Sequence, residues 1–218
     1  MIADLGPYAE YKDSGVPWVG KIPAHWNIQK LSKLAQFRSG GTPSKQIPAF
    51  WKGTIPWLSP KDFSGTLIRD TRDHITSEAV AASSTTVRPP GEVFIVARSG
   101  ILRHTIPVAL SERPLAINQD IKAVRVERSV CVPEFLLRWI QGNNGVLLRL
   151  WVKQGTTVES LEQRYVLSTP VALPPSPNKP PSSASLPGQP GAWTVPSGRS
   201  GALWPSSPNR SRPSSTAR

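Results

Sequence analysis

The chain has one cysteine in 218 residues, few acidic side chains and no long apolar run. A single cysteine, Cys131, cannot form an intrachain disulfide or a structural zinc site, so stability has to come from a packed core in a reducing compartment. No apolar stretch reaches the roughly 18 residues that a membrane helix needs, and the N-terminal residues show no secretion signal. We therefore expect a cytoplasmic protein that does not enter a membrane.

Positive charge is in clear excess. The sequence has 26 Lys and Arg against 14 Asp and Glu, a formal net charge of +12. Five of these cations follow position 170, which leaves +7 on residues 1–170. Such a balance favours an anionic partner such as nucleic acid, although charge alone does not establish one.

Composition changes abruptly near the C-terminal end. Residues 171–218 contain 11 Pro, 11 Ser and 4 Gly and no acidic residue. A segment of this kind buries too little apolar surface to offset its chain entropy, so we predict a disordered basic tail over 171–218. The rest of the chain predicts an α+β fold. It consists of an N-terminal arm over 1–27, packed on the surface of a single mixed α/β domain over 28–170 that has a twisted sheet and short helices.

Several elements of that domain can be placed from the pattern of residues. The apolar run Val93–Ala97 is typical of a strand buried on both faces, and residues 121–126 are its expected partner. Two prolines, Pro56 and Pro60, predict that any strand over 51–63 lies at a sheet edge. Short helices are expected over 77–82, from Pro133 onward, over 146–151, and over 158–165.

Motifs for catalysis or metal binding are weak. The segment Gly40–Lys45 lacks the spacing of a phosphate-binding Walker loop, and His25, His74 and His104 lack metal-ligand spacing. The tripeptide Asp120-Ile121-Lys122 is similar to half of a metal-dependent nuclease site, but its upstream acidic partner is missing. A surface strand that carries one acid and one base is the simpler alternative, because a tripeptide alone is too short to be specific. We expect no catalytic residue, no metal and no cofactor.

Five stretches, in order along about 165 residues, together resemble one family. They resemble the N-terminal target-recognition domain of the specificity (S) subunit of type I restriction-modification systems. The resemblance implies a DNA reader without a catalytic centre, which takes one half of a split duplex target, while methyltransferase and translocase-nuclease subunits supply the chemistry. The stretches are Tyr11–Trp26, Ser39–Ser44, Trp51–Asp62, Pro90–Arg98 with Ala116–Gln119, and Lys153–Thr157.

Candidate DNA-binding residues follow from these segments. Cations are expected to contact phosphates, and polar side chains are expected to read base edges in the major groove, with Gln119 suited to adenine. For any single cation a solvated surface charge is the simpler alternative, and the tryptophans of the arm, Trp18 and Trp26, leave open a protein-interaction module. The candidates are Gly41, Thr42, Ser44, Lys45, Trp57, Lys61, Arg98, Arg103, Gln119, Lys153, Gly155, Thr156 and Thr157.

The chain departs from the family pattern after Leu173-Pro174-Pro175. The family continues with a Leu-Pro-Pro-Leu-Ala-Glu-Gln-like junction, a long spacer helix and a second recognition domain. Codons for Pro175–Ser183 read two bases later permit that junction, so we hypothesise that a frameshift near codon 175 produced the tail. A native flexible basic arm is the alternative. Loss of the spacer helix would impair docking of the methyltransferase and restriction subunits.

Overall fold

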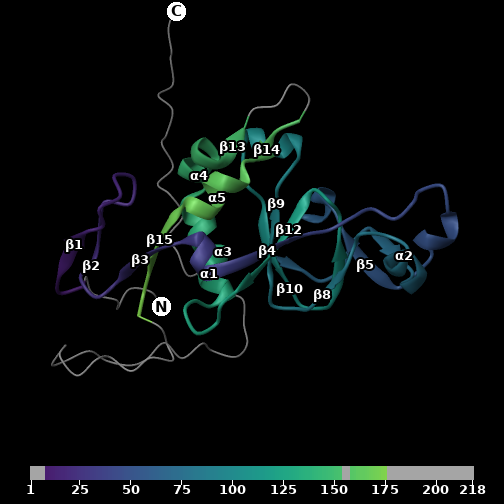
Figure 1. The fold of residues 1–218 in the computed structure, drawn as a ribbon, viewed down its shortest axis with the longest axis horizontal. Coiled ribbons are helices and arrows are strands. Elements are labelled where there is room, and N and C mark those ends of the chain that lie inside the picture. The colour runs from purple at the N-terminus through teal and green to yellow at the C-terminus, as the bar shows by residue number, and fades with distance from the viewer. Residues whose placement is uncertain (1–7, 154–157, 176–218) are drawn as a thin grey trace, which may run out of the picture.

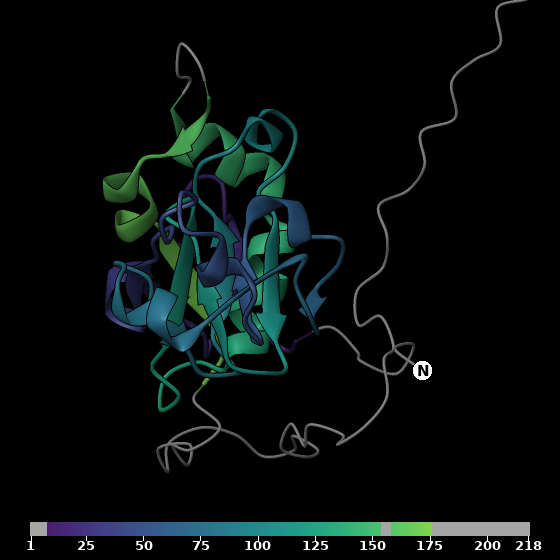
Figure 2. The same cartoon turned by 90° about the vertical axis from the view of Figure 1, so that its right-hand side faces the viewer.

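Two stacked β-sheets form the centre of the protein, and helices cover the outer face of the larger sheet (Figure 1; Figure 2 is the same cartoon turned by 90°). The computed structural model describes residues 8–153 and 158–175, and every statement below concerns that part of the chain. None of its helices is long and apolar enough to span a membrane. The mixed α/β architecture with short helices confirms the fold class predicted from the sequence.

The larger sheet has five strands and the smaller has four, and both mix parallel and antiparallel pairs. The larger has the order β4 (Ala35–Ser39), β12 (Ile121–Val126), β9 (Val93–Val96), β10 (Val108–Ser111), β6 (Leu67–Ile68). The smaller has the order β7 (Asp73–Ile75), β5 (Ile55–Leu58), β11 (Leu115–Ile117), β8 (Val87–Arg88). Three two-stranded pairs complete the strands: β1 (Tyr11–Asp13) with β2 (Lys21–Pro23), β3 (Asn27–Lys30) with β15 (Pro170–Leu173), and β13 (Val152–Lys153) with β14 (Ser160–Leu161).

The helices are short and begin where the sequence offers a start signal. Pro133 occupies the first position of α3, where a missing N–H costs nothing, and the Thr76 hydroxyl accepts a hydrogen bond from the Ala79 N–H at the start of α2. The α-helices are α1 (Leu31–Leu34), α2 (Ser77–Ala81), α3 (Pro133–Gly142), α4 (Asn144–Trp151) and α5 (Gln163–Ser168). The 3₁₀ turns are η1 (Pro48–Trp51), η2 (Pro60–Asp62) and η3 (Gly100–Arg103).

Alternation along the central strands explains the layers. On β9, Val93 and Ile95 face the cluster that includes the helices, whereas Phe94 and Val96 face the smaller sheet. Side chains of a strand point to opposite faces in turn, so a strand covered on both sides has to be apolar throughout. The prediction that Val93–Ala97 contains such a strand, with residues 121–126 as its antiparallel partner, is confirmed.

The prediction that the strand with Pro56 lies at an edge is wrong, because β5 lies between β7 and β11. Pro56 has no N–H to donate, but none is needed on this side, because the pairing of β5 with β11 begins only at Trp57, opposite Ala116. The Trp57 N–H is satisfied separately by the Thr71 hydroxyl, at 3.0 Å. The strand therefore tolerates its proline in the interior of a sheet, because no ladder bond to β11 is needed at that position.

Two predicted boundaries also differ from the structure. Val171–Leu173 belong to β15, where they are buried and paired with β3, so they are part of the folded domain rather than of a tail that begins at 171. The helix expected over 158–165 is instead strand β14 followed by α5, because residues 159–161 bond to neighbouring segments. Residues 176–218 lie outside the described part of the chain.

The N-terminal arm contains the hairpin β1–β2 (Figure 1). Trp18 packs against Trp139 of α3 with ring centroids 6.1 Å apart, and Trp26 packs against Phe135 at 6.2 Å. These aromatic residues join the arm to α3, which favours a packing role for them over a free protein-binding surface.

Candidate nucleic-acid interface

The candidate residues are gathered by the turn Asn118–Asp120, which connects β11 to β12. Strands β4, β5, β9 and β11 all end beside this turn, and β12 begins there. Four hydrogen bonds join the turn to segments far away in the sequence. The Asn118 N–H donates to the Leu58 carbonyl, the Ala97 and Arg98 N–H groups donate to the Asp120 carbonyl, and the Thr42 hydroxyl donates to the Gln119 side chain. One end of both sheets therefore collects most of the predicted site.

The first part of this region is the Trp57 corner, formed by Gly41, Thr42, Trp57 and Gln119. Gly41 donates its N–H to the Ile117 carbonyl and accepts the Trp57 indole N–H through its own carbonyl, both at 3.0 Å. A β-carbon on Gly41 would lie 2.1 Å from the Ser84 hydroxyl and 2.8 Å from the Thr85 nitrogen, so only glycine fits. Trp57 is 5% exposed and packs edge-on against Trp51. Gly41 and Trp57 thus build the corner and are not available to a ligand.

Thr42 and Gln119 lie on the surface of the Trp57 corner. The Thr42 hydroxyl donates to the Gln119 side-chain oxygen and occupies one of the two acceptor sites of that oxygen, so the N–H donors of the Gln119 amide are its most open groups. Bidentate reading of adenine requires both the oxygen and the nitrogen of the amide. In this arrangement Gln119 most readily donates, which favours an acceptor such as guanine O6 or a phosphate oxygen.

The second part is the hairpin edge, formed by Arg98, Arg103, Lys153 and Glu159. Here the pair β13–β14 is attached to the segment after β9. Arg98 bridges Ser160, the Leu161 N–H donates to the Ala97 carbonyl at 2.8 Å, and the Ser99 N–H donates to the Glu159 carbonyl at 3.1 Å. These bonds place Arg98 and Lys153, both exposed, on neighbouring segments. Of the predicted loop after Lys153, Gly155, Thr156 and Thr157 lie outside the described residues.

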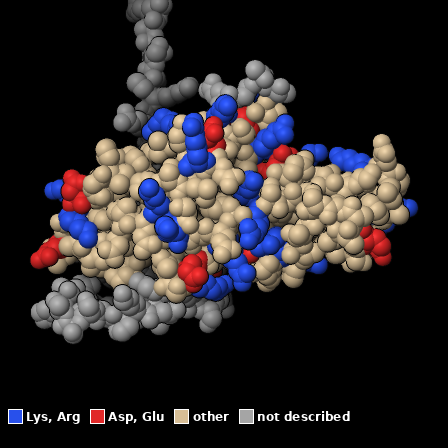
Figure 3. Space-filling view, in the orientation of Figure 1, with Lys and Arg blue, Asp and Glu red and all other residues tan. Residues whose placement is uncertain are grey.

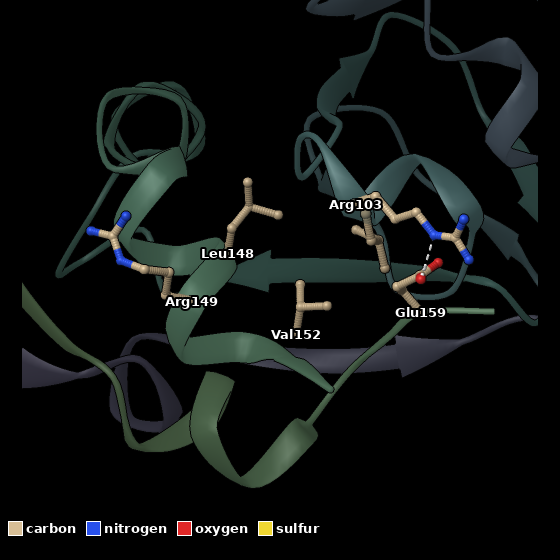
Figure 4. A pocket seen from close by; sticks show the side chains of 6 residues that line it. Arg103, Leu148, Arg149, Val152 and Glu159 are labelled. Carbon is tan, nitrogen blue, oxygen red and sulfur yellow. Dashed lines mark hydrogen bonds and ion pairs between the residues drawn. The ribbon is translucent and has the colours of Figure 1, made fainter. Parts of the chain in front are cut away.

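Arg103 and Glu159 form an ion pair beside a hollow between η3 and α4. The Arg103 Nε lies 2.6 Å from a Glu159 carboxylate oxygen, and this bond is the main cause of the lowered pKa of Glu159. The hollow has a volume of about 360 Å³, and Figure 4 shows Leu148 and Val152 on the wall opposite the pair. Its remaining lining residues are Leu102 and Arg149.

Of the other candidate cations, Lys61 lies on the exposed turn that follows β5, and Lys45 lies on the exposed segment that follows Thr42. Asp62 fixes the turn that carries Lys61, because its carboxylate accepts the Ser59 N–H and hydroxyl and the Arg72 N–H. Ser44 and Lys45 are exposed on the segment that precedes η1. Lys45, Lys61, Arg98 and Lys153 make no ion pair with any other described residue. Lys and Arg also outnumber Asp and Glu over the middle of the face in Figure 3.

The nuclease interpretation gains no geometric support. Asp120 lies in the turn, where its backbone N–H is bound to the Asn118 side chain, and Lys122 lies in β12, where its ammonium donates to the Ser39 hydroxyl at 3.2 Å. No cluster of three or more His, Cys, Asp or Glu suited to a metal occurs among the described residues. A metal-dependent nuclease needs several such ligands around the attacking water.

A family model described as "Type I restriction modification DNA specificity domain" matches residues 23–179, most of the chain. The chain belongs to this family. The match confirms the expectation of a type I restriction-modification DNA specificity domain. It includes the Asn118–Asp120 turn and both parts of the candidate interface of this specificity domain.

Named relatives agree with this assignment. The specificity domain is 35% identical over 165 residues to the type I restriction enzyme EcoR124I/EcoR124II specificity subunit of Escherichia coli. It is 31% identical over 130 residues to the MjaIX specificity subunit of Methanocaldococcus jannaschii. These matches cover 75% and 58% of the present chain, but only 38% and 28% of the two relatives. The chain thus corresponds to well under half of each relative.

Solved structures support the fold. The HsdS subunit from Thermoanaerobacter tengcongensis superimposes with a TM-score of 0.54 at 15% identity, over 76% of this chain and 36% of that one. A chain from a type I restriction-modification system, described in a study of complex assembly, gives the same TM-score at 17% identity, over 71% and 35%. At these identities the likeness concerns the fold of the specificity domain alone.

Sequence reasoning missed the residues that hold the interface in place. Glu159, Asp62 and Asn118 carry out this task, through Arg103, the Lys61 turn and the Leu58 carbonyl respectively. Only Asp62 had a local signal, since Ser59 and Asp62 form a capping box with three-residue spacing. The partners of Glu159 and Asn118 lie more than 50 residues away along the chain, so no local pattern identifies them.

Proposed function

We propose that this domain binds duplex DNA sequence-specifically as the recognition component of a type I restriction-modification system. It reads one half of a bipartite target through the major groove and performs no chemistry of its own. The observation that carries the proposal is the convergence of three separate segments, which contain Thr42, Leu58 and Ala97–Arg98, on the Asn118–Asp120 turn. These segments bring the exposed cations Lys61 and Arg98 and the side chains of Thr42 and Gln119 to one end of the sheets.

The cations and the polar side chains of the interface would have different roles. Lys45, Lys61, Arg98 and Lys153 would contact phosphates, which fixes register but carries no sequence information. Thr42, Ser44 and Gln119 present hydroxyl and amide groups of the kind that read base edges. With so few phosphate contacts, a single domain should bind weakly at physiological salt.

Selection from randomised duplexes with the full chain tests the proposal. We expect a short enriched motif of three or four base pairs, and tighter binding to that motif than to a scrambled duplex at the same salt concentration. Binding that shows no preference even at low ionic strength would overturn the proposal. Salt titration of both duplexes then separates the phosphate contribution from base reading, because only the former depends steeply on salt.

We also propose that bond-making belongs to methyltransferase and restriction subunits, and that their docking is impaired here. The sequence after Leu173 is too rich in proline to form a long spacer helix, since an internal proline removes a helix hydrogen bond and clashes with the preceding turn. Co-purification of a methylating complex with this chain as the sole specificity component would contradict this. The frameshift proposal is tested by the gene sequence, which has to encode a helix in another frame over codons 175–218.

A further inference from the structure

The Arg103–Glu159 pair differs from the other ion pairs near the surface in how unequally its partners are exposed. The Glu159 side chain is 7% exposed, whereas the Arg103 side chain is 62% exposed. Glu159 is therefore part of the interior, and Arg103 reaches from it into solvent. Figure 4 shows the carboxylate beneath the guanidinium, with Arg149 pointing away from both.

The carboxylate is placed by the backbone before it meets its arginine. The backbone carbonyl of Glu159 accepts a 3.1 Å hydrogen bond from the Ser99 N–H, and the next residue, Ser160, forms a β-bridge with Arg98. Its second oxygen, Oε2, is buried and has no hydrogen-bond partner among the described residues. A ligand cannot reach this oxygen from solvent, so the carboxylate can act on a ligand only through the arginine that covers it.

The bond uses the arginine in a specific way. The Nε of Arg103 donates to Glu159 and the arginine side chain is largely exposed, so the two terminal nitrogens of the guanidinium are left for a ligand. Those two nitrogens form a planar fork that matches a phosphate or the O6 and N7 of guanine. An arginine free in solution adopts many rotamers, and fixing one of them in advance lowers the entropic cost of binding.

We propose that Glu159 is a positioning residue, which holds the Arg103 fork toward DNA and fixes the hairpin edge at the same time. The inference rests on the proposed function, because it assigns the mechanism by which one part of that interface is preorganised. Glu159 does not touch the ligand, and its influence on DNA passes through Arg103 alone.

The variant Glu159→Gln separates this proposal from simple electrostatics. Removal of a negative charge near DNA raises affinity for every duplex if charge is all that matters. If Glu159 positions Arg103, affinity for the selected motif falls about three- to tenfold while affinity for a scrambled duplex holds or rises, as expected when one fork contact is lost. The measured quantity is the Kd ratio, which is the Kd for the scrambled duplex divided by the Kd for the selected motif at one salt concentration.

Glu112→Gln is the matched control. Glu112 pairs with Arg69 at 3.2 Å, but this pair is exposed on both sides and lies at the end of β10 and β6 opposite to the interface. Its loss should leave the Kd ratio unchanged. A second test is Arg103→Ala, in whose background Glu159→Gln should have no further effect on the ratio, because its only route to the DNA is gone.

Each outcome decides a separate question. If the unmodified chain has no sequence preference, the proposed function fails before the variants are compared. If the unmodified chain discriminates and Glu159→Gln behaves like Glu112→Gln, the positioning role is wrong while the DNA-reading function stands.

Should Glu159→Gln fail to fold, Arg103→Lys replaces it. Lysine keeps the charge but lacks the fork, so it should preserve the salt dependence and reduce the Kd ratio; an unchanged ratio would overturn the proposal.

Discussion

The Trp57 corner and the hairpin edge were both expected to touch DNA, yet they use their residues differently. In the corner, the motif residues Gly41 and Trp57 are buried and bond to each other, so the sequence pattern there encodes architecture. At the hairpin edge, Arg98, Arg103 and Lys153 are exposed, and backbone bonds hold the segments that carry them. A motif residue in such a domain can therefore be a structural element or a ligand contact, and burial separates the two.

The largest effect should come from the corner. Trp57→Ala removes a buried ring together with its bond to the Gly41 carbonyl, so we expect the free energy of unfolding to fall by about 3–5 kcal/mol in chemical denaturation. Lys61→Ala, an exposed neighbour along the chain, should change it by no more than about 0.5 kcal/mol. A Trp57→Ala protein of normal stability that no longer bound DNA would erase the distinction between the two regions.

The hairpin edge should show the reverse pattern. The double variant Arg98→Ala/Lys153→Ala is expected to keep its stability, and to reduce the slope of log Kd against log salt by about two, one for each lost phosphate contact. Salt titration of DNA binding measures the slope. Arg69→Ala at the opposite end of the sheet is the control, and it should leave the slope nearly unchanged. An equal loss in both proteins would show that only total charge matters.

A smaller effect is expected from the surface of the corner. Thr42→Val keeps the shape of the side chain but removes the hydroxyl that occupies the Gln119 oxygen. The freed amide can then offer both a donor and an acceptor, which suits adenine. Repeating the duplex selection should shift the preference at one base pair toward adenine, by up to about tenfold. An identical motif from both proteins would mean that Gln119 does not read a base.

The smallest expected effect is a local response to acid. The hydrogen bond from Arg103 holds the pKa of Glu159 below its ordinary value of 4.5. The carboxylate therefore stabilises the hairpin edge above the unfolded pKa, and this contribution is lost as the pH falls through the lower, folded value. Hydrogen exchange, corrected for intrinsic rates, should show the Leu161 amide losing protection on acidification before the Gly41 amide does. Glu159→Gln should abolish this step, and its persistence would assign it to another group.

How much of this could be predicted depended on the range of the interactions. Alternating burial made β9 and its partner predictable, because the apolar run is a local signal. The position of β5 was not predictable from the local sequence. The strand tolerates Pro56 because its pairing with β11 begins only at Trp57, opposite Ala116, and these two residues are 59 positions apart in the chain. The same holds within the interface. Exposed cations could be nominated from the sequence, whereas Glu159 acquires its role only when folding brings it to Arg103.

The pair β3–β15 has a mechanical consequence for the domain. Asn27 lies opposite Leu173 and Lys30 opposite Pro170, so β3 begins and β15 finishes at the same end of one antiparallel pair. A pulling force applied between Asn27 and Leu173 therefore loads these backbone bonds one after another rather than all together. The domain should yield to tension first at this pair and only later in its stacked sheets, which are attached to the load indirectly.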